Sequence, residues 1–115
     1  MTEDTLYSLL SSLAGGQVYP YVAPLNESGS PGISPPWIVF SLPSEVSEDT
    51  LCGQAETSVT IQVDVYAARV KEARALRDQA LENLSSLGLE NISKFPGYEP
   101  EAQLHRATFE ASVIV

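Results

Sequence analysis

The side chains that could carry out chemistry are few and lie far apart in the chain. Cys52 is the single cysteine and His105 the single histidine, so they offer neither an internal disulfide nor a zinc site. A catalytic thiol needs a basic neighbour or a histidine to lower its pKa, but the residues around Cys52 are acidic. We therefore predict that both residues are structural and that the protein holds no metal.

Neighbouring carboxylates could serve as general acid and base if a pocket moved their pKa values apart. Glu45, Glu48 and Asp49 are the candidates, and all three fall in a segment that we expect to be an acidic loop. In a chain with fifteen acidic residues, neighbouring carboxylates are expected by chance. The glycines match neither the dinucleotide-binding fingerprint nor the P-loop. The sequence therefore predicts no catalytic residue and no cofactor.

Charge is distributed unevenly along the chain. The net charge is -9, and no Lys or Arg precedes Arg69, after which Lys71, Arg74 and Arg77 follow closely. Binding of nucleic acid depends on Lys and Arg that neutralise phosphates, so sequence-specific binding of DNA or RNA is not expected. The basic cluster could meet the acidic half of a neighbouring subunit, or the charges could simply keep the protein soluble.

Length and hydropathy predict one folded domain over residues 1–115. A chain of 115 residues, 43% of them hydrophobic, can form a core of modest size. Its apolar runs are much shorter than the roughly 20 residues of a membrane-spanning helix. The acidic start, Met1-Thr2-Glu3-Asp4, lacks the features of a secretory signal. We expect no membrane association and synthesis that ends in the cytoplasm.

The elements that must position any site centre on one strand and one helix. Residues 57–67 alternate strictly, which is typical of a strand with one buried face and one wet or partner-facing face. The predicted inward residues are Val59, Ile61, Val63 and Val65, and the predicted outward residues are Thr60, Gln62, Asp64 and Tyr66. A long helix at about 68–87 follows, ended by Gly88, and its apolar stripe covers one sheet face.

Elements on either side of this pair complete an α+β fold with a mostly antiparallel sheet. A short helix at about 3–14 comes first. Residues 17–24 form a strand that its prolines confine to a sheet edge, where another chain can dock. A strand at 37–42 begins with Trp37, which we assign to the core.

The remaining residues form loops, turns and a closing strand. Flexible loops are expected at about 26–36, where no packed core can form, and at 44–54. Residues 89–95 could form a short strand before a turn at 96–100. From 103 to 115 the residues alternate again, and His105 falls on the apolar face.

Several short motifs in this order and spacing resemble the tail terminator, or tail completion, proteins of long-tailed bacteriophages and prophages. The resemblance covers nearly the whole chain, although the loop at 26–36 is longer than usual in that family. The motifs are Val18-Tyr19-Pro20, Val22-Ala23-Pro24, Pro36-Trp37-Ile38-Val39-Phe40, Val63-Asp64-Val65-Tyr66-Ala67 and Glu72-Ala73-Arg74-Ala75-Leu76.

The resemblance implies a structural protein and no enzyme. Members of this family assemble as a ring, usually a hexamer, on the head-proximal end of the tail tube, stop its polymerisation and offer the surface for head joining. The implied partners are further copies of this chain, the tail tube protein and the head–tail connector protein. DNA would pass through without specific binding, and the protein would assemble in the host cytoplasm and end in the virion tail.

Candidate interface residues follow from the edge strand, the outward sheet face and the basic cluster. They are Tyr19, Tyr21, Gln62, Asp64, Tyr66, Arg69, Arg74 and Arg77. The alternative function is a small ligand- or peptide-binding α+β module, whose ligand would lie on the open sheet face near Gln62, Asp64, Tyr66 and Arg106. A concave pocket would distinguish that alternative.

Overall fold

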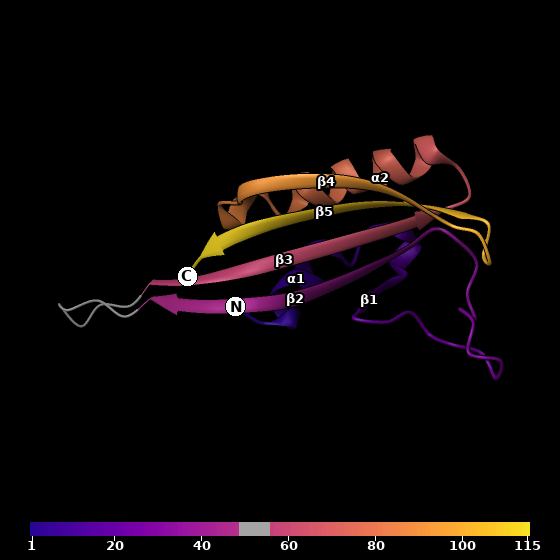
Figure 1. Ribbon diagram of the computed structural model, residues 1–115, viewed down its shortest axis with the longest axis horizontal. Coiled ribbons are helices and arrows are strands. Elements are labelled where there is room, and N and C mark those ends of the chain that lie inside the picture. Colours follow the sequence, from indigo (N-terminus) through magenta and orange to yellow (C-terminus); the bar gives the residue numbers. More distant parts are fainter. Residues whose placement is uncertain (49–55) are drawn as a thin grey trace.

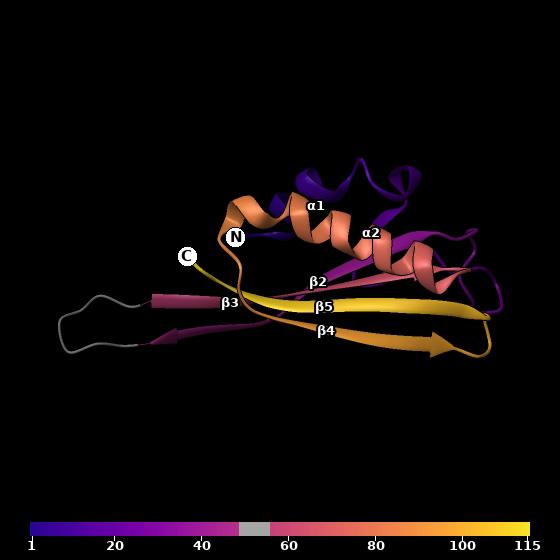
Figure 2. The ribbon, with the colours of Figure 1, turned by 90° about the horizontal axis from the view of Figure 1, so that it is seen from above.

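The computed structural model describes residues 1–48 and 56–115. Within these residues the chain forms one five-stranded sheet with both α-helices on one face (Figures 1 and 2). The predicted α+β class is therefore confirmed. In chain order the elements are α1 (Glu3–Leu10), η1 (Ala14–Gly16), β1 (Val18–Pro20), β2 (Trp37–Glu48), β3 (Glu56–Ala67), α2 (Val70–Asn83), η2 (Ser85–Leu87), β4 (Glu90–Glu99) and β5 (Leu104–Ile114).

The sheet has the strand order β1-β2-β3-β5-β4. Only the β1–β2 pair is parallel among the described strands, and the other three pairs are antiparallel. The predicted edge position of the first strand is confirmed, but β1 has three residues instead of the predicted eight at 17–24. It ends because Tyr21 has a φ of 65°, which turns the chain out of the extended conformation.

The main core lies between the helices and the sheet. The four predicted inward residues of β3 are all 2% exposed or less, and the side chains of Phe40 and Phe109 from β2 and β5 join them. Ala80 of α2 and Leu84, the residue that follows α2, contribute apolar side chains to this core. Fully burying each large side chain contributes about 1.5–3 kcal/mol, so this layer holds the helices on the sheet.

Both helices are shorter than predicted. α1 ends at Leu10 instead of residue 14, and the chain continues as the 3₁₀ turn η1. α2 spans Val70–Asn83 instead of 68–87, because Arg69 is still extended and the 3₁₀ turn η2 replaces the last α-helical turn. Gly88 follows in a left-handed conformation with φ 76°, which confirms its predicted role as the stop.

β2 is twice as long as its predicted range of 37–42. It continues through Pro43 to Glu48 and pairs with β3 as far as Glu56, after a register shift between Ser41 and Ser44. The shift is a β-bulge, which accommodates the proline in the part of β2 that extends beyond its pairing with β1. The predicted flexible loop at 44–54 is therefore wrong for residues 44–48. Residues 49–54, which include Asp49 and Cys52, lie outside the described residues.

β4 also runs through residues that we expected to form a turn. It spans Glu90–Glu99 and includes Pro96 and Gly97. Val115 N donates to Thr57 O, so the odd-numbered residues of β5 direct their backbone groups towards β3 and the even-numbered ones towards β4. Pro96 is the partner of Ala107, an odd-numbered residue. The backbone nitrogen of Pro96 therefore points away from β5, to the open edge of the sheet. The missing N–H therefore costs no ladder bond. A Cβ at Gly97 would lie 2.8 Å from Nε of Arg106, so glycine makes room for that side chain.

A second, smaller cluster lies on the opposite face of the sheet, which we call the outer face. Trp37 is 4% exposed there and packs with Ala23 and Leu104. The assignment of Trp37 to a core is confirmed, but this core is not the one beneath the helices. Ile33 packs against the cluster, so the expectation that the 26–36 segment takes part in no packed core is wrong at this residue.

Candidate functional site

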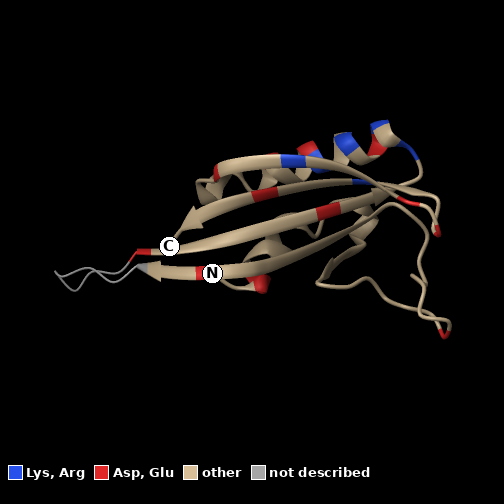
Figure 3. Ribbon diagram, in the orientation of Figure 1, with Lys and Arg blue, Asp and Glu red and all other residues tan. Residues whose placement is uncertain are grey.

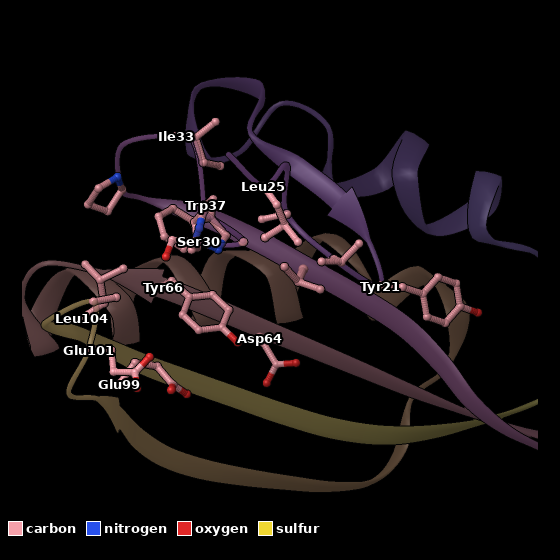
Figure 4. A pocket seen from close by; sticks show the side chains of 17 residues that line it. Tyr21, Leu25, Ser30, Ile33, Trp37, Asp64, Tyr66, Glu99, Glu101 and Leu104 are labelled. Atoms are coloured by element: carbon pink, nitrogen blue, oxygen red, sulfur yellow. The ribbon is translucent and has the colours of Figure 1, made fainter. Parts of the chain in front are cut away.

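A cavity of about 680 Å³ opens on the outer face of the sheet (Figure 4). Strand alternation directs Trp37 and Val39 of β2 and Asp64 and Tyr66 of β3 to its floor. The segment between β1 and β2 forms one wall, and the end of β4 with the start of β5 forms the other. We call this cavity the outer pocket. Its volume falls in the range of clefts that bind small molecules or several side chains.

The floor of the outer pocket is aromatic. Trp37 and Tyr66 are partners in the β2–β3 register, and their rings stack with centroids 5.4 Å apart and planes 24° apart. Cross-strand aromatic pairs of this kind contribute about 0.5–1.5 kcal/mol beyond their buried area. Burial raises the pKa of the Tyr66 hydroxyl, the nearby charge of Asp64 raises it further, and Arg106 offsets part of this rise. Tyr66 therefore stays neutral at physiological pH.

Asp64 lies next to Tyr66 and is held by two side chains. Thr108 Oγ1 donates to its Oδ1 at 2.5 Å, and Gln62 Nε2 donates to its Oδ2 at 3.1 Å. Thr108 faces Asp64 directly across the β3–β5 pair, which explains the short contact. The carboxylate is therefore fixed in position at the floor of the outer pocket.

The wall from β4 and β5 adds two more carboxylates, Glu99 and Glu101. Glu99 Oε1 lies 3.1 Å from Nη1 of Arg106, whereas Glu101 is exposed and makes no ion pair with any described residue. Of the described residues that line the outer pocket, none is Lys or Arg. The outer pocket therefore combines an aromatic and aliphatic interior with an acidic rim.

Basic residues concentrate at the start of α2, as Figure 3 shows. Arg69, Lys71 and Arg74 are exposed and form no ion pair with other described residues. Arg77 differs, because its side chain is 12% exposed and its Nε lies 3.2 Å from Asp78 Oδ1. The pairing of Arg74 with Asp78 that helical spacing allows is not observed.

The structure divides the predicted interface residues between two places. Tyr21, Asp64 and Tyr66 line the outer pocket, where Tyr19 packs against the Trp37 cluster and Gln62 holds Asp64. The arginines of the prediction, Arg69, Arg74 and Arg77, lie in the helical layer or just before it, on the other face of the sheet (Figure 2).

Tyr21 belongs to the margin of the outer pocket. Its hydroxyl points away from the other labelled side chains in Figure 4 and donates to Glu3 Oε1 at 2.6 Å. This hydrogen bond raises the pKa of Tyr21 and lowers the pKa of the Glu3 carboxyl. It ties the start of α1 to the segment after β1.

Sequence reasoning missed several lining residues, above all Trp37, Glu99 and Glu101. Trp37 is the register partner of Tyr66, so both side chains lie on the outer face. Neither strand by itself specifies this register. The two glutamates flank Pro100. A predicted strand that ran to residue 99 instead of 95 would have placed them beside the start of β5. Arg106, expected on the ligand face, does not line the outer pocket and pairs with Glu99.

Of the two other residues considered for chemistry, Cys52 lies outside the described residues, and His105 forms no metal site with the residues that are described. His105 is half-buried, and its ring lies 4.9 Å from the ring of Tyr98. Among residues 1–48 and 56–115, no group of three His, Cys, Asp or Glu side chains could hold a metal ion. No helix in these ranges is long and apolar enough to cross a membrane.

Comparison with known proteins supplies a family for this fold. No curated protein matches the sequence. The family model described as Tail completion protein gp17 matches residues 5–115, which include every helix and strand described above except the first two residues of α1. The chain therefore belongs to the tail completion protein gp17 family and is a structural component of a phage tail.

Proposed function

We propose that this protein assembles as a ring, with six subunits the expected number, on the head-proximal end of the tail tube. There it stops tube polymerisation and provides the surface to which the head joins. The observation that carries this proposal is the family match over residues 5–115, nearly the whole chain. Its partners would be further copies of the chain, the tail tube protein and the head–tail connector protein. Assembly would take place in the host cytoplasm.

Two properties of the subunit agree with a ring through which DNA passes. Its two sheet faces differ, with an acidic pocket on one and a basic helix start on the other, and contacts between unlike surfaces generate rings or filaments. Fifteen acidic residues stand against six basic ones, so acidic side chains facing the lumen would let DNA pass without binding. A ring with a basic inner wall would contradict the acidic lumen.

The end of β2 and the start of β3, which pair with each other, offer a candidate contact with the tube or a neighbouring subunit. Figure 2 shows that these strand ends project beyond the helical layer. Val46 of β2 and Ile114 of β5 lie on either side of Ser58 in the sheet register, and they are 57% and 51% exposed. Exposed apolar side chains in a row are typical of surfaces that a partner covers.

Tube polymerisation in the presence of this protein tests the proposal. Purified tail tube protein from the same phage would be polymerised with and without it, and the tubes examined by negative-stain electron microscopy. We expect shorter tubes with a ring at one end, and a length that falls as the ratio of this protein to tube protein rises. An unchanged length distribution and bare tube ends at every ratio would refute capping.

The outer pocket favours a second candidate, a small ligand- or peptide-binding module. The cavity of about 680 Å³ is the concave feature that this alternative needs, and it contains Asp64 and Tyr66. Thermal unfolding in the presence of a library of cationic and aromatic small molecules and basic peptides would test it. A ligand that stabilises the protein while tube length stays unchanged would favour the binding module over the cap.

A further inference from the structure

We infer that the outer pocket of one subunit receives the basic start of α2, residues 69–74, from a second copy of this chain. The inference rests on the proposed ring and names the contact between its subunits. A second copy is the occupant that we infer because the two surfaces carry opposite charge.

The receiving surface is acidic at its rim and apolar inside. Glu101 extends from the turn between β4 and β5 without an ion-pair partner among the described residues. Asp64 lies on the floor, and Glu99 lies in the same wall as Glu101, where it pairs with Arg106. Tyr66 is half-buried and presents its ring on the floor. An aromatic ring near carboxylates favours a cationic side chain, whose aliphatic stem packs on the ring while its head pairs with the acids.

The inserting surface has the opposite character. Arg69, Lys71 and Arg74 are exposed, and Val70 between them is 42% exposed, which supplies an apolar side chain for the interior of the outer pocket. Glu72 is the one carboxylate in this stretch, so three cations and one anion give residues 69–74 a charge of +2. The cations at the start of α2 are therefore opposite in charge to the acidic rim, where Glu101 has no ion-pair partner among the described residues.

Within one subunit the two surfaces do not pair, since no ion pair joins the cations of residues 69–74 to a described carboxylate. Figures 1 and 2 show the start of α2 and the β4–β5 turn at the same end of the molecule, with the sheet between the helical layer and the outer face. The contact that we infer is therefore intermolecular. Because the two patches are different, each subunit can use both at once, which joins copies head to tail and permits a closed ring.

Charge reversal with a mixing step tests this contact. Glu101→Lys changes the rim, and Lys71→Glu with Arg74→Glu changes the helix. Residue 71 lies in the first turn of α2, where an acidic side chain favours the helix dipole, and residue 74 is exposed, so the fold should persist. Association would be followed by sedimentation velocity across protein concentration at low and physiological salt. We expect each variant alone to need at least about tenfold more protein to associate.

Mixing the two variants should restore association. In a mixed assembly, the reversed rim meets the reversed helix at one contact, and the native rim meets the native helix at the next. Glu82→Lys is the matched control, because Glu82 is exposed near the other end of α2 and does not line the outer pocket. It should associate like the wild type. Normal association of both charge variants, or a mixture no better than its components, would overturn the inference.

Disulfide trapping provides a second measurement that detects weak contacts. Ala102→Cys in the lining and Lys71→Cys on α2, in a background with Cys52→Ser, should give dimers and larger cross-linked ladders on oxidation. Replacing Lys71→Cys by Glu82→Cys should abolish them. The absence of a ladder at every protein concentration would also overturn the inference.

These results separate the inference from the proposed function. If the charge variants associate normally while the wild type still shortens tubes, the assigned contact is wrong and capping stands. If mixing restores association but the wild type leaves tube length unchanged, the contact between copies stands and capping is wrong.

Discussion

Replacing Thr108 by valine tests how strongly the side-chain network of the outer pocket stabilises the fold. Thr108 is 7% exposed, and its hydroxyl donates to Asp64 at 2.5 Å. Valine keeps the shape of threonine but cannot donate, so Asp64 keeps only the hydrogen bond from Gln62 among its described side-chain partners. A hydrogen bond to a charged group contributes about 1.5–3 kcal/mol.

The low end of that range applies here, because Asp64 is half-buried and water can replace part of the lost bond. We expect Thr108→Val to lower the free energy of unfolding by about 1.5 kcal/mol. For a chain of 115 residues, this corresponds to a melting temperature lower by roughly 5–7 °C.

Urea unfolding of a double-mutant cycle would measure this contribution. The cycle combines Thr108→Val with Asp64→Ala, and the expected coupling energy is about 1.5 kcal/mol. Thr60→Val is the matched control, since Thr60 lies on the same face of β3 and makes no side-chain hydrogen bond with a described residue. It should change stability by less than about 0.5 kcal/mol. A coupling energy below about 0.5 kcal/mol would refute the assigned role of this hydrogen bond.

Three further predictions test other parts of the structure. Tyr21→Phe removes the donor to Glu3, so the pKa of Glu3 should rise towards its ordinary value in an NMR titration; in the wild type this stabilisation is present at neutral pH and disappears as pH falls through the lowered pKa. An unchanged titration would contradict the hydrogen bond. Gly88→Ala should cost about 1 kcal/mol in urea unfolding, because nothing surrounds the new Cβ and the cost comes from φ 76° alone. Val46→Asp should weaken tube capping without lowering the melting temperature, since Val46 is 57% exposed; capping equal to that of the wild type would exclude this side chain from the interface.

Strand and helix patterns predicted the main core well. The alternation of Val59, Ile61, Val63 and Val65 assigned each side chain to its observed face, since successive residues of a strand point to opposite sides. The stop at Gly88 also followed from local chemistry, because glycine tolerates the left-handed conformation that ends the helical segment. These features depend on a residue and its close neighbours in sequence.

Two prolines led to the same wrong prediction of a strand end. Pro43 and Pro96 indicated the ends of strands, but both lie inside long strands, one at a β-bulge and the other facing the free edge of β4. Whether a proline interrupts a sheet depends on the side to which its nitrogen points. That direction is set by the pairing partner, which the local sequence does not specify.

The sequence by itself determined the α+β class, the faces of β3 and β5, and the separation of an acidic half from a basic segment. Only the tertiary structure decided that Trp37 stacks on Tyr66, that Glu99 and Glu101 border the same cavity, and that the basic start of α2 lies across the sheet from them. The reason is physical. Periodicity and charge are properties of neighbouring residues, whereas a pocket requires a strand register and loop path that bring distant segments together.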